Sequence, residues 1–272
     1  RPEAPRGNLT GMSLVEITDA DGVRTITVNR PDAYNSLNRD LRLALIEAFT
    51  AAAEDSATGG PVRTVVLQAA GKAFCSGQDL KEQLVDAREG TGSTKVVEAY
   101  NPMMAALLSI PVPVIAAVQG PAAGAGWGIA MACDFRVMSS AASFKGAFSG
   151  VGLASDCGLS QSLTDAVGQT RALELLLFDE KIPAEQAAAL GIVTTVVEPE
   201  ELADTVAGLA QRFSTGPTAS YREIKALVRD AAAVNTRADE EGDAQLRLFT
   251  TADHVEAMAA FLEKRAPHFI GE

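Results

Sequence analysis

Residues 114–133 read VIAAVQGPAAGAGWGIAMAC and carry the clearest structural pattern in the chain. Residues 114–118 form a short, wholly apolar run, which is typical of a buried strand. Residues 120–128 are rich in glycine, and residues 129–133 can continue as a helix. A strand that leads through a glycine-rich loop towards a helix is the kind of connection from which α/β folds are built.

Strand and helix patterns alternate on both sides of this stretch. Residues 14–18 and 23–28 are alternating, β-branched runs, and the turn chemistry of residues 19–22 between them predicts a hairpin. Residues 38–53 have apolar side chains at helical spacing, with Asn38 placed to cap the helix. We predict further strands at residues 62–68, 135–138 and 143–145, and further helices at residues 94–108, 201–213 and 221–231.

The last third of the chain is mainly helical, whereas strands and helices alternate before it. This change predicts an α/β core over residues 12–210 and a helical region over residues 211–272. The polar, proline-bearing residues 1–11 predict a flexible tail rather than a signal peptide. No apolar run is long enough to span a bilayer, so we expect no membrane partner.

The formal net charge of −12 limits the partners further. Nucleic acids and anionic membrane surfaces both attract clustered Lys and Arg, so we expect neither as a partner. A phosphorylated ligand is compatible with this charge, because a few cations or helix N-termini can hold phosphates. The three cysteines, Cys75, Cys133 and Cys157, show neither metal-ligand spacing nor a disulfide framework. We therefore expect a reduced, cytoplasmic setting, with no metal ion and no redox cofactor.

Two loops carry the pattern that points to chemistry. Residues 74–80, FCSGQDL, directly follow one predicted strand, and residues 120–128 follow another. Glycines after a strand let the backbone turn its N–H groups towards a ligand, and a helix start adds positive dipole character. Two such loops that face each other can supply two N–H donors to one oxygen, which makes an oxyanion hole.

Four segments, in order along the chain, resemble the crotonase family, also called the enoyl-CoA hydratase/isomerase family. They are NRPDAYNSLN (29–38), AFCSGQDL (73–80), VQGPAAGAG (118–126) and AFLEKRAPHF (260–269). The resemblance implies an α/β spiral of β-β-α turns and a helical C-terminal region that forms a homotrimer or a dimer of trimers. It also implies that the substrate is an acyl-coenzyme A thioester, whose enolate the oxyanion hole stabilises.

The resemblance assigns roles to matching positions of this chain. The oxyanion donors fall on the backbone N–H groups of Gln78 and Ala125; many family members have glycine at the second position, but alanine keeps the same N–H. We expect Asp79 to cap the turn that follows it rather than to act as a catalyst. Substrate contacts are also implied at Arg30, Ala33, Ser76, Gly77, Asp79, Leu80, Gly124, Trp127, Gly128, Phe148, Phe261 and Lys264.

The coenzyme contacts that the resemblance implies fall on two parts of the chain. The family's nucleotide end matches Arg30 and Ala33, with Lys72 nearby in sequence. Phe261 and Lys264 lie where family members reach towards the coenzyme A of an adjacent subunit.

The proton-transferring groups differ from those of a hydratase. The family's hydratases use two glutamates to position and split water, and these positions hold Gly128 and Phe148 in this chain. Asp156 matches the acidic residue of bacterial epoxyphenylacetyl-CoA isomerases and related enoyl-CoA delta-isomerases. We therefore expect Asp156 to remove a proton from one carbon of an unsaturated or epoxidised acyl group and return it to another. Burial beside Phe148 is expected to raise the pKa of Asp156.

Plainer alternatives stand beside these assignments. An aspartate before a helical run is a common N-cap, so Asp156 could cap a helix without chemistry. Trp127 could line the acyl pocket or fill the core. His254, in the C-terminal helical region, is expected at the surface or at an interface.

Other reactions on the same scaffold also stay open. They are weak hydration, thioester hydrolysis by water, and acyl-CoA binding without turnover. Dehalogenation of an aroyl-CoA is disfavoured, because Asn101 and Phe148 stand where that reaction requires a histidine and a tryptophan.

Overall fold

A six-stranded sheet forms the centre of the fold in the computed structural model, which describes residues 13–89 and 94–272. The tail expected at residues 1–11 lies outside the described residues. The strands of the sheet, in spatial order, are β1 (Val15–Ala20), β2 (Val23–Val28), β3 (Thr64–Ala69), β4 (Val114–Val118), β6 (Phe135–Ser139) and β9 (Thr195–Val197). Strands β1 and β2 pair antiparallel, and every other neighbouring pair is parallel.

The predicted hairpin is present, with a tighter turn than expected. Strand β1 continues to Ala20, so only Asp21 and Gly22 lie between the strands. Both residues have positive φ angles, 50° and 79°, and this backbone suits the right-handed twist of a two-residue hairpin.

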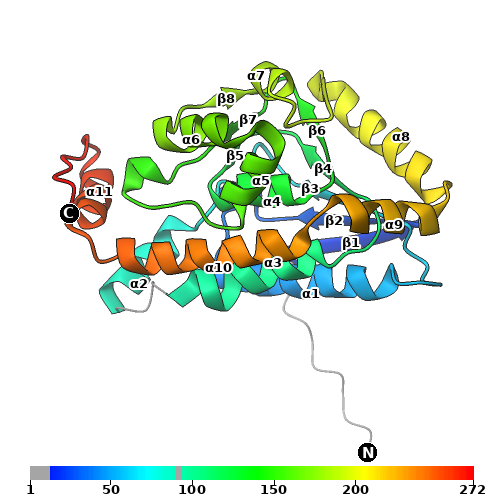
Figure 1. The fold of residues 1–272 in the computed structure, drawn as a ribbon, viewed down its shortest axis with the longest axis horizontal. Coiled ribbons are helices and arrows are strands. Elements are labelled where there is room, and N and C mark those ends of the chain that lie inside the picture. Colours follow the sequence, from blue (N-terminus) through cyan, green and yellow to red (C-terminus); the bar gives the residue numbers. More distant parts are fainter. Residues whose placement is uncertain (1–12, 90–93) are drawn as a thin grey trace, which may run out of the picture.

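Helices cover both faces of the central sheet, as Figure 1 shows. Helix α1 (Arg39–Asp55) begins at the cap predicted for it, where the side chain of Asn38 accepts a hydrogen bond from the amide of Leu41 at 3.1 Å. Helix α8 (Leu202–Ser214) packs on the opposite face against Val66 and its neighbours. Alternate residues of a strand point to opposite faces, so Val66 contacts α8 while Val65 and Leu67 join the main core. The predicted α/β class is confirmed.

The glycine-rich stretch differs from its prediction in one respect. Strand β4 spans the predicted residues, but helix α4 (Ala125–Ala132) begins four residues earlier than the predicted 129–133. A two-residue strand, β5 (Ala122–Ala123), precedes it and pairs with β7 (Ser143–Lys145), which in turn pairs with β8 (Ile182–Pro183) in a second sheet. Every side of α4 is buried, so its sequence shows no amphipathic pattern.

The segment between the first loop and β4 also departs from the prediction. Helix α2 (Leu80–Glu89) was not predicted, and the expected helix at 94–108 consists of a π-helical turn, η3 (Val96–Tyr100), followed by α3 (Asn101–Leu108). Short 3₁₀ turns occur at η1 (Pro31–Ala33), η4 (Ser149–Val151) and η5 (Pro199–Glu201). A π-helical turn leaves no sequence periodicity of its own, so pattern analysis reads it as ordinary helix.

The last third of the chain is mainly helical, as predicted. Its other helices are α5 (Leu159–Val167), α6 (Gln169–Phe178), α7 (Ala184–Ala189), α9 (Thr218–Val228), α10 (Ala231–Leu248) and α11 (Ala252–Glu263). The long helix α10 runs beside α3 and α5 (Figure 1), so it returns to the segments that follow the two loops. Within residues 13–89 and 94–272, no helix is both long and apolar enough to cross a bilayer.

Candidate active site

A cleft of about 580 Å³ opens beside the two glycine-bearing loops. Its walls come from both loops, from η3 and η4, and from the C-terminal helices α10 and α11. The cleft brings together most of the residues that sequence analysis assigned to the site: Arg30, Ala33, Ser76, Gly77, Gln78, Asp79, Leu80, Gly124, Ala125, Phe148, Asp156 and Phe261.

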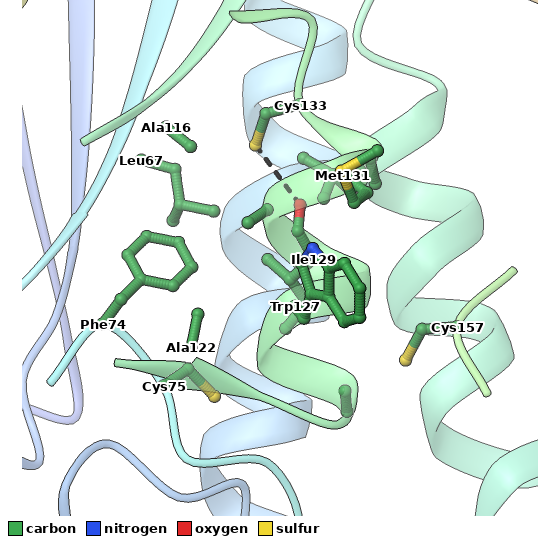
Figure 2. Close-up of a cluster of buried hydrophobic side chains, with 14 of the residues drawn as sticks. Leu67, Phe74, Cys75, Ala116, Ala122, Trp127, Ile129, Met131, Cys133 and Cys157 are labelled. Atoms are coloured by element: carbon green, nitrogen blue, oxygen red, sulfur yellow. Dashed lines mark hydrogen bonds between the residues drawn. The ribbon is translucent and has the colours of Figure 1, made fainter. Parts of the chain in front are cut away.

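Three of the assigned residues do not line the cleft. Trp127 is fully buried in the core, where its ring stacks on Phe144 with 5.6 Å between the ring centroids. Figure 2 shows Trp127 among other buried side chains around helix α4, with Phe74 and Cys157 in the same cluster. Gly128 is also buried in α4, whereas Lys264 is exposed at the end of α11. Of the two roles considered for Trp127, the structure shows the core-filling one.

The two loops are joined through their backbones. The amide of Ala123 donates to the carbonyl oxygen of Cys75 at 2.9 Å, within a parallel bridge between the loops. Next to this bridge, a Cβ on Gly77 would lie 2.8 Å from the carbonyl oxygen of Ala123 and 3.6 Å from the amide nitrogen of Ala125. Gly77 also has a φ angle of 86°, so a side chain here would both collide with the second loop and strain the backbone.

The amides of Gln78 and Ala125 are available to a ligand. Leu37 donates to the carbonyl oxygen of Gly77 at 2.8 Å and accepts from the amide of Asp79 at 3.4 Å. In such a parallel bridge the amide of the residue between them, Gln78, points away from Leu37. Ala125 is the first residue of α4, where a helix leaves its N–H groups without a partner. Across residues 13–89 and 94–272, neither amide donates a hydrogen bond.

The side chain of Gln78 is held in place by groups that sequence analysis did not identify. The hydroxyl of the buried Tyr100 donates a short hydrogen bond to Oε1 of Gln78, and Nε2 of Gln78 donates to the carbonyl oxygen of Asp79. The Arg42 guanidinium lies 5.0 Å from the centre of the Tyr100 ring. Burial raises the pKa of the Tyr100 hydroxyl well above its ordinary value, so Tyr100 is a neutral donor.

Asp79 caps helix α2, in the way expected from the sequence. Its Oδ1 accepts from the amides of Lys81 at 2.8 Å and Glu82 at 3.1 Å. Its Oδ2 binds the guanidinium of Arg30, which also donates to both oxygens of Ser36. Hydrogen bonds from Arg30 and from these amides outweigh burial and lower the pKa of Asp79, so this carboxylate is ionised and unsuited to carrying protons.

Asp156 has the opposite environment. Its side chain is buried, with 8% of the residue exposed, and its Oδ1 has no hydrogen-bond partner in the part of the chain that the structure describes. Burial raises its pKa from 3.8 to about 7, and the nearby negative charge of Glu241 acts in the same direction, while the Cys157 thiol opposes the shift. A carboxyl group with a pKa near neutrality can both accept and release a proton.

The capping role considered for Asp156 is filled by another residue. Helix α5 begins after Gly158, and the carboxylate of Glu241, from α10, accepts from the amide of Gly158 at 2.6 Å and from that of Ser160 at 2.9 Å. The backbone carbonyl of Asp156 accepts from the amide of Leu159 at 3.1 Å, but among the described residues no amide at the start of α5 donates to the Asp156 side chain. Its side chain is therefore not required to hold the start of the helix.

The two positions that the resemblance matches to the glutamates of hydratases differ in what they lack. Gly128 has no room for a side chain, and Phe148 has no ionisable group. A Cβ on Gly128 would lie 2.6 Å from the Cβ of Cys157, so helix α4 and the Asp156 loop are in direct contact there. The ring of Phe148 packs next to Gly124, 3.8 Å from where a Cβ would be. Hydrocarbon therefore lies beside the second loop, at a position that the resemblance matches to a glutamate of hydratases.

Part of the cleft lining is apolar and comes from η4, the residues that follow it, and the C-terminal helices. Its side chains are Val151, Leu153, Phe249, Met258 and Phe261. Beneath this wall, His254 is buried and its Nδ1 lies 2.8 Å from the carbonyl oxygen of Val151. The prediction that His254 lies at the surface is wrong, because α11 turns this side chain towards η4.

The residues that sequence analysis missed are Tyr100, Glu241 and Gln245. Each reaches the site from a helix whose sequence pattern is that of an ordinary amphipathic or buried segment. No local motif marks them, since their partners lie on segments distant in the sequence.

Comparisons with known proteins agree with this geometry. The profile of the enoyl-CoA hydratase/isomerase family matches residues 18–272. The 1,2-epoxyphenylacetyl-CoA isomerase of Escherichia coli is 38% identical, with 92% of this chain and 96% of that protein covered. A probable enoyl-CoA hydratase of Rhodobacter capsulatus is 37% identical, covering 93% and 96%. The crystal structure of an enoyl-CoA hydratase from Mycobacterium avium subsp. paratuberculosis has a TM-score of 0.80 at 32% identity, covering 96% and 100%.

Proposed function

Because the chain belongs to the enoyl-CoA hydratase/isomerase family, we propose that it isomerises an unsaturated acyl-CoA thioester with Asp156 as its proton carrier. One observation carries this proposal: Asp156 is a buried carboxyl with an unbonded oxygen in the same cleft as the two free loop amides. The cleft thus combines one acid–base group with one site for negative charge on oxygen.

The proposed reaction starts from a 3-enoyl thioester. The thioester oxygen accepts hydrogen bonds from the amides of Gln78 and Ala125. The ionised Asp156 removes a proton from C2, and the electron pair moves onto the thioester oxygen, which the two amides stabilise. Protonated Asp156 then returns the proton to C4, and the double bond moves from C3–C4 to C2–C3. The reaction is balanced without water and without any cofactor beyond the coenzyme A of the substrate.

The apolar side chains that line the cleft support an acyl group with little polarity. Phe148, Phe249 and Phe261 line the cleft together with aliphatic side chains. The name of the Escherichia coli relative supports an epoxidised aryl-acetyl thioester as a second substrate to be tried. The two kinds of relatives, one named isomerase and one named hydratase, make hydration the competing reaction.

The test is incubation of the protein with a 3-enoyl-CoA and, separately, with a 2-enoyl-CoA, followed by mass-resolved chromatography. Isomerisation gives a product of unchanged mass with a shifted retention time, whereas hydration adds the mass of water. Formation of the 2-enoyl isomer without hydration supports the proposal. Rapid hydration would overturn it and would mean that a residue other than Asp156 activates water. Binding without turnover of any thioester would identify an acyl-CoA-binding protein.

We also propose that the chain assembles as a homotrimer or as a dimer of trimers through its C-terminal helices. Helix α9 supports this assembly, because Leu227 and Val228 are 85% and 81% exposed and Ile224 is exposed beside them. A row of exposed apolar side chains on one helix is typical of a surface that another protein covers.

A further inference from the structure

Glu241 is a buried acid that no sequence pattern marked. Only 5% of the residue is exposed, and it projects from α10 into the segment that carries Asp156. Its carboxylate accepts three hydrogen bonds, from the Ser155 hydroxyl at 2.8 Å and from the amides of Gly158 and Ser160. Burial of a carboxylate costs free energy unless its oxygens accept hydrogen bonds. The three donors to Glu241 compensate for that cost.

The three donors flank Asp156 on both sides. Between them the chain makes an unusual turn, with φ angles of 60° at Cys157 and 66° at Gly158. Left-handed backbone is unfavourable for a residue with a side chain, so the turn persists only where its surroundings hold it. One helical turn after Glu241, Gln245 donates from Nε2 to the carbonyl oxygen of Ala154. Helix α10 therefore clamps the loop at both ends.

This clamp determines which hydrogen-bond donors remain for the Asp156 carboxyl. Glu241 accepts from the hydroxyl and amide donors that surround the turn, and the Oδ1 of Asp156 remains buried without a hydrogen-bond partner among the described residues. Other ionisable groups that act on Asp156 or on its neighbours are the thiols of Cys75 and Cys157 and the hydroxyl of Tyr100. Burial raises the pKa of each of these three groups, so all three are neutral and Glu241 brings a negative charge.

We propose that Glu241 is a positioning residue for Asp156: it holds the Ser155–Ser160 turn so that Oδ1 of Asp156 has no hydrogen-bond partner among the described residues and lies near a second negative charge. This inference rests on the proposed role of Asp156 as proton carrier. Glu241 itself does not line the cleft, so it acts through Asp156 rather than on the substrate.

The experiment compares Glu241→Gln with a matched control on the same helix, Glu240→Gln. Glu240 is exposed and paired with Arg237, so its substitution removes the same charge without touching the Asp156 loop. The rate constant kcat/KM is measured from pH 5 to pH 9 for the wild type and both variants, about the range over which a group with a pKa near 7 titrates. We expect the acidic limb of the Glu241→Gln profile to move to lower pH by at least about half a unit, because a neighbouring negative charge no longer opposes ionisation. The control profile should match that of the wild type.

Direct titration of Asp156 separates this inference from the proposed function. The infrared band of the protonated carboxyl is followed against pH, with Asp156→Asn to assign it. A midpoint that falls in Glu241→Gln supports the inference even if the wild type turns over no thioester, in which case only the proposed reaction fails. An unchanged midpoint overturns the inference, whatever the activity.

A second variant covers the case in which Glu241→Gln does not fold. Ser155→Ala removes one hydrogen bond to Glu241 and keeps the negative charge. We expect its Asp156 midpoint to stay at the wild-type pH while kcat falls several-fold with KM little changed, because the turn is loosened but the charge remains. Wild-type kcat in Ser155→Ala, or a midpoint that moves in this variant, would contradict the division of roles.

Discussion

The hydroxyl of Tyr100 donates a hydrogen bond to the side-chain oxygen of Gln78, which lines the cleft and whose backbone N–H has no partner among the described residues. This contact ties the first loop to the π-helical turn η3. Loss of the hydroxyl should therefore let the loop move, although the backbone donor itself is untouched.

We expect Tyr100→Phe to lower kcat/KM several-fold and to lower the free energy of unfolding by about 1 kcal/mol, the usual net value of one buried hydrogen bond. Steady-state kinetics and urea denaturation measure the two effects. Tyr34→Phe is the matched control, because Tyr34 also lines the cleft but is exposed. Equal effects of the two substitutions would show that the contact with Gln78 has no special role.

Substitution of the proposed proton carrier should abolish turnover and preserve the fold. We expect Asp156→Asn to reduce kcat by about 10²–10⁴-fold, the range of general acid–base catalysis. The Asp156 side chain makes no capping bond, so the helical content should be unchanged in circular dichroism. Binding of a non-reactive acyl-CoA analogue, measured by calorimetry, should persist. Full isomerase activity in this variant would contradict the proposed mechanism.

The raised pKa of Asp156 also predicts how stability depends on pH. The folded state keeps the proton up to a pKa of about 7, whereas the unfolded chain releases it near 3.8. Because the folded state binds more protons between these values, this residue makes the free energy of unfolding fall as pH rises through that window. Asp156→Asn should therefore gain stability over the wild type as pH increases from 4 to 8, by about 1.4 kcal/mol for each unit of pKa difference at most. A constant gap across this range in urea denaturation would contradict the assigned pKa.

The contact between α4 and the Asp156 loop can be tested with a single methyl group. We expect Gly128→Ala to lower the free energy of unfolding by about 1–3 kcal/mol, the usual cost of overpacking, because its Cβ would meet that of Cys157 at 2.6 Å. Gly208→Ala in α8 is the control, since nothing lies within 4 Å of its added Cβ. The control should gain about 0.4–1 kcal/mol through the unfolded state. Thermal or urea unfolding that ranks the two variants the other way would contradict the packing described.

The proposed assembly predicts a change in mass when its surface is charged. Leu227→Asp places a carboxylate in the exposed apolar row of α9 and should convert the assembly to monomers in light scattering. Ile17→Asp, on the exposed side of the edge strand β1, is the control and should leave the mass unchanged. A monomeric wild type would refute the assembly directly.

Local sequence patterns predicted much of the secondary structure and the two loops of the site. The hairpin, strand β4 and the Asn38 cap were recognisable because turn chemistry, strand alternation and capping depend on residues only a few positions apart. The two loops were recognisable for the same reason, since their glycines and the strands before them are contiguous in the sequence, whereas Gln78 and Ala125 were assigned through the family resemblance.

Tertiary structure alone decided the surroundings that give these residues their chemistry. Helix α4 starts inside a glycine-rich run because burial on every side compensates for its weak intrinsic preference, and Trp127 is core because of where that helix packs. Glu241 replaces Asp156 as the cap of α5 because α10 returns to that loop from a distant part of the chain. Sequence analysis thus determined the fold class, the loops and, through the family resemblance, the expectation of a buried Asp156 with a raised pKa. The free oxygen of Asp156 and the nearby Glu241 follow from long-range packing that no local pattern encodes.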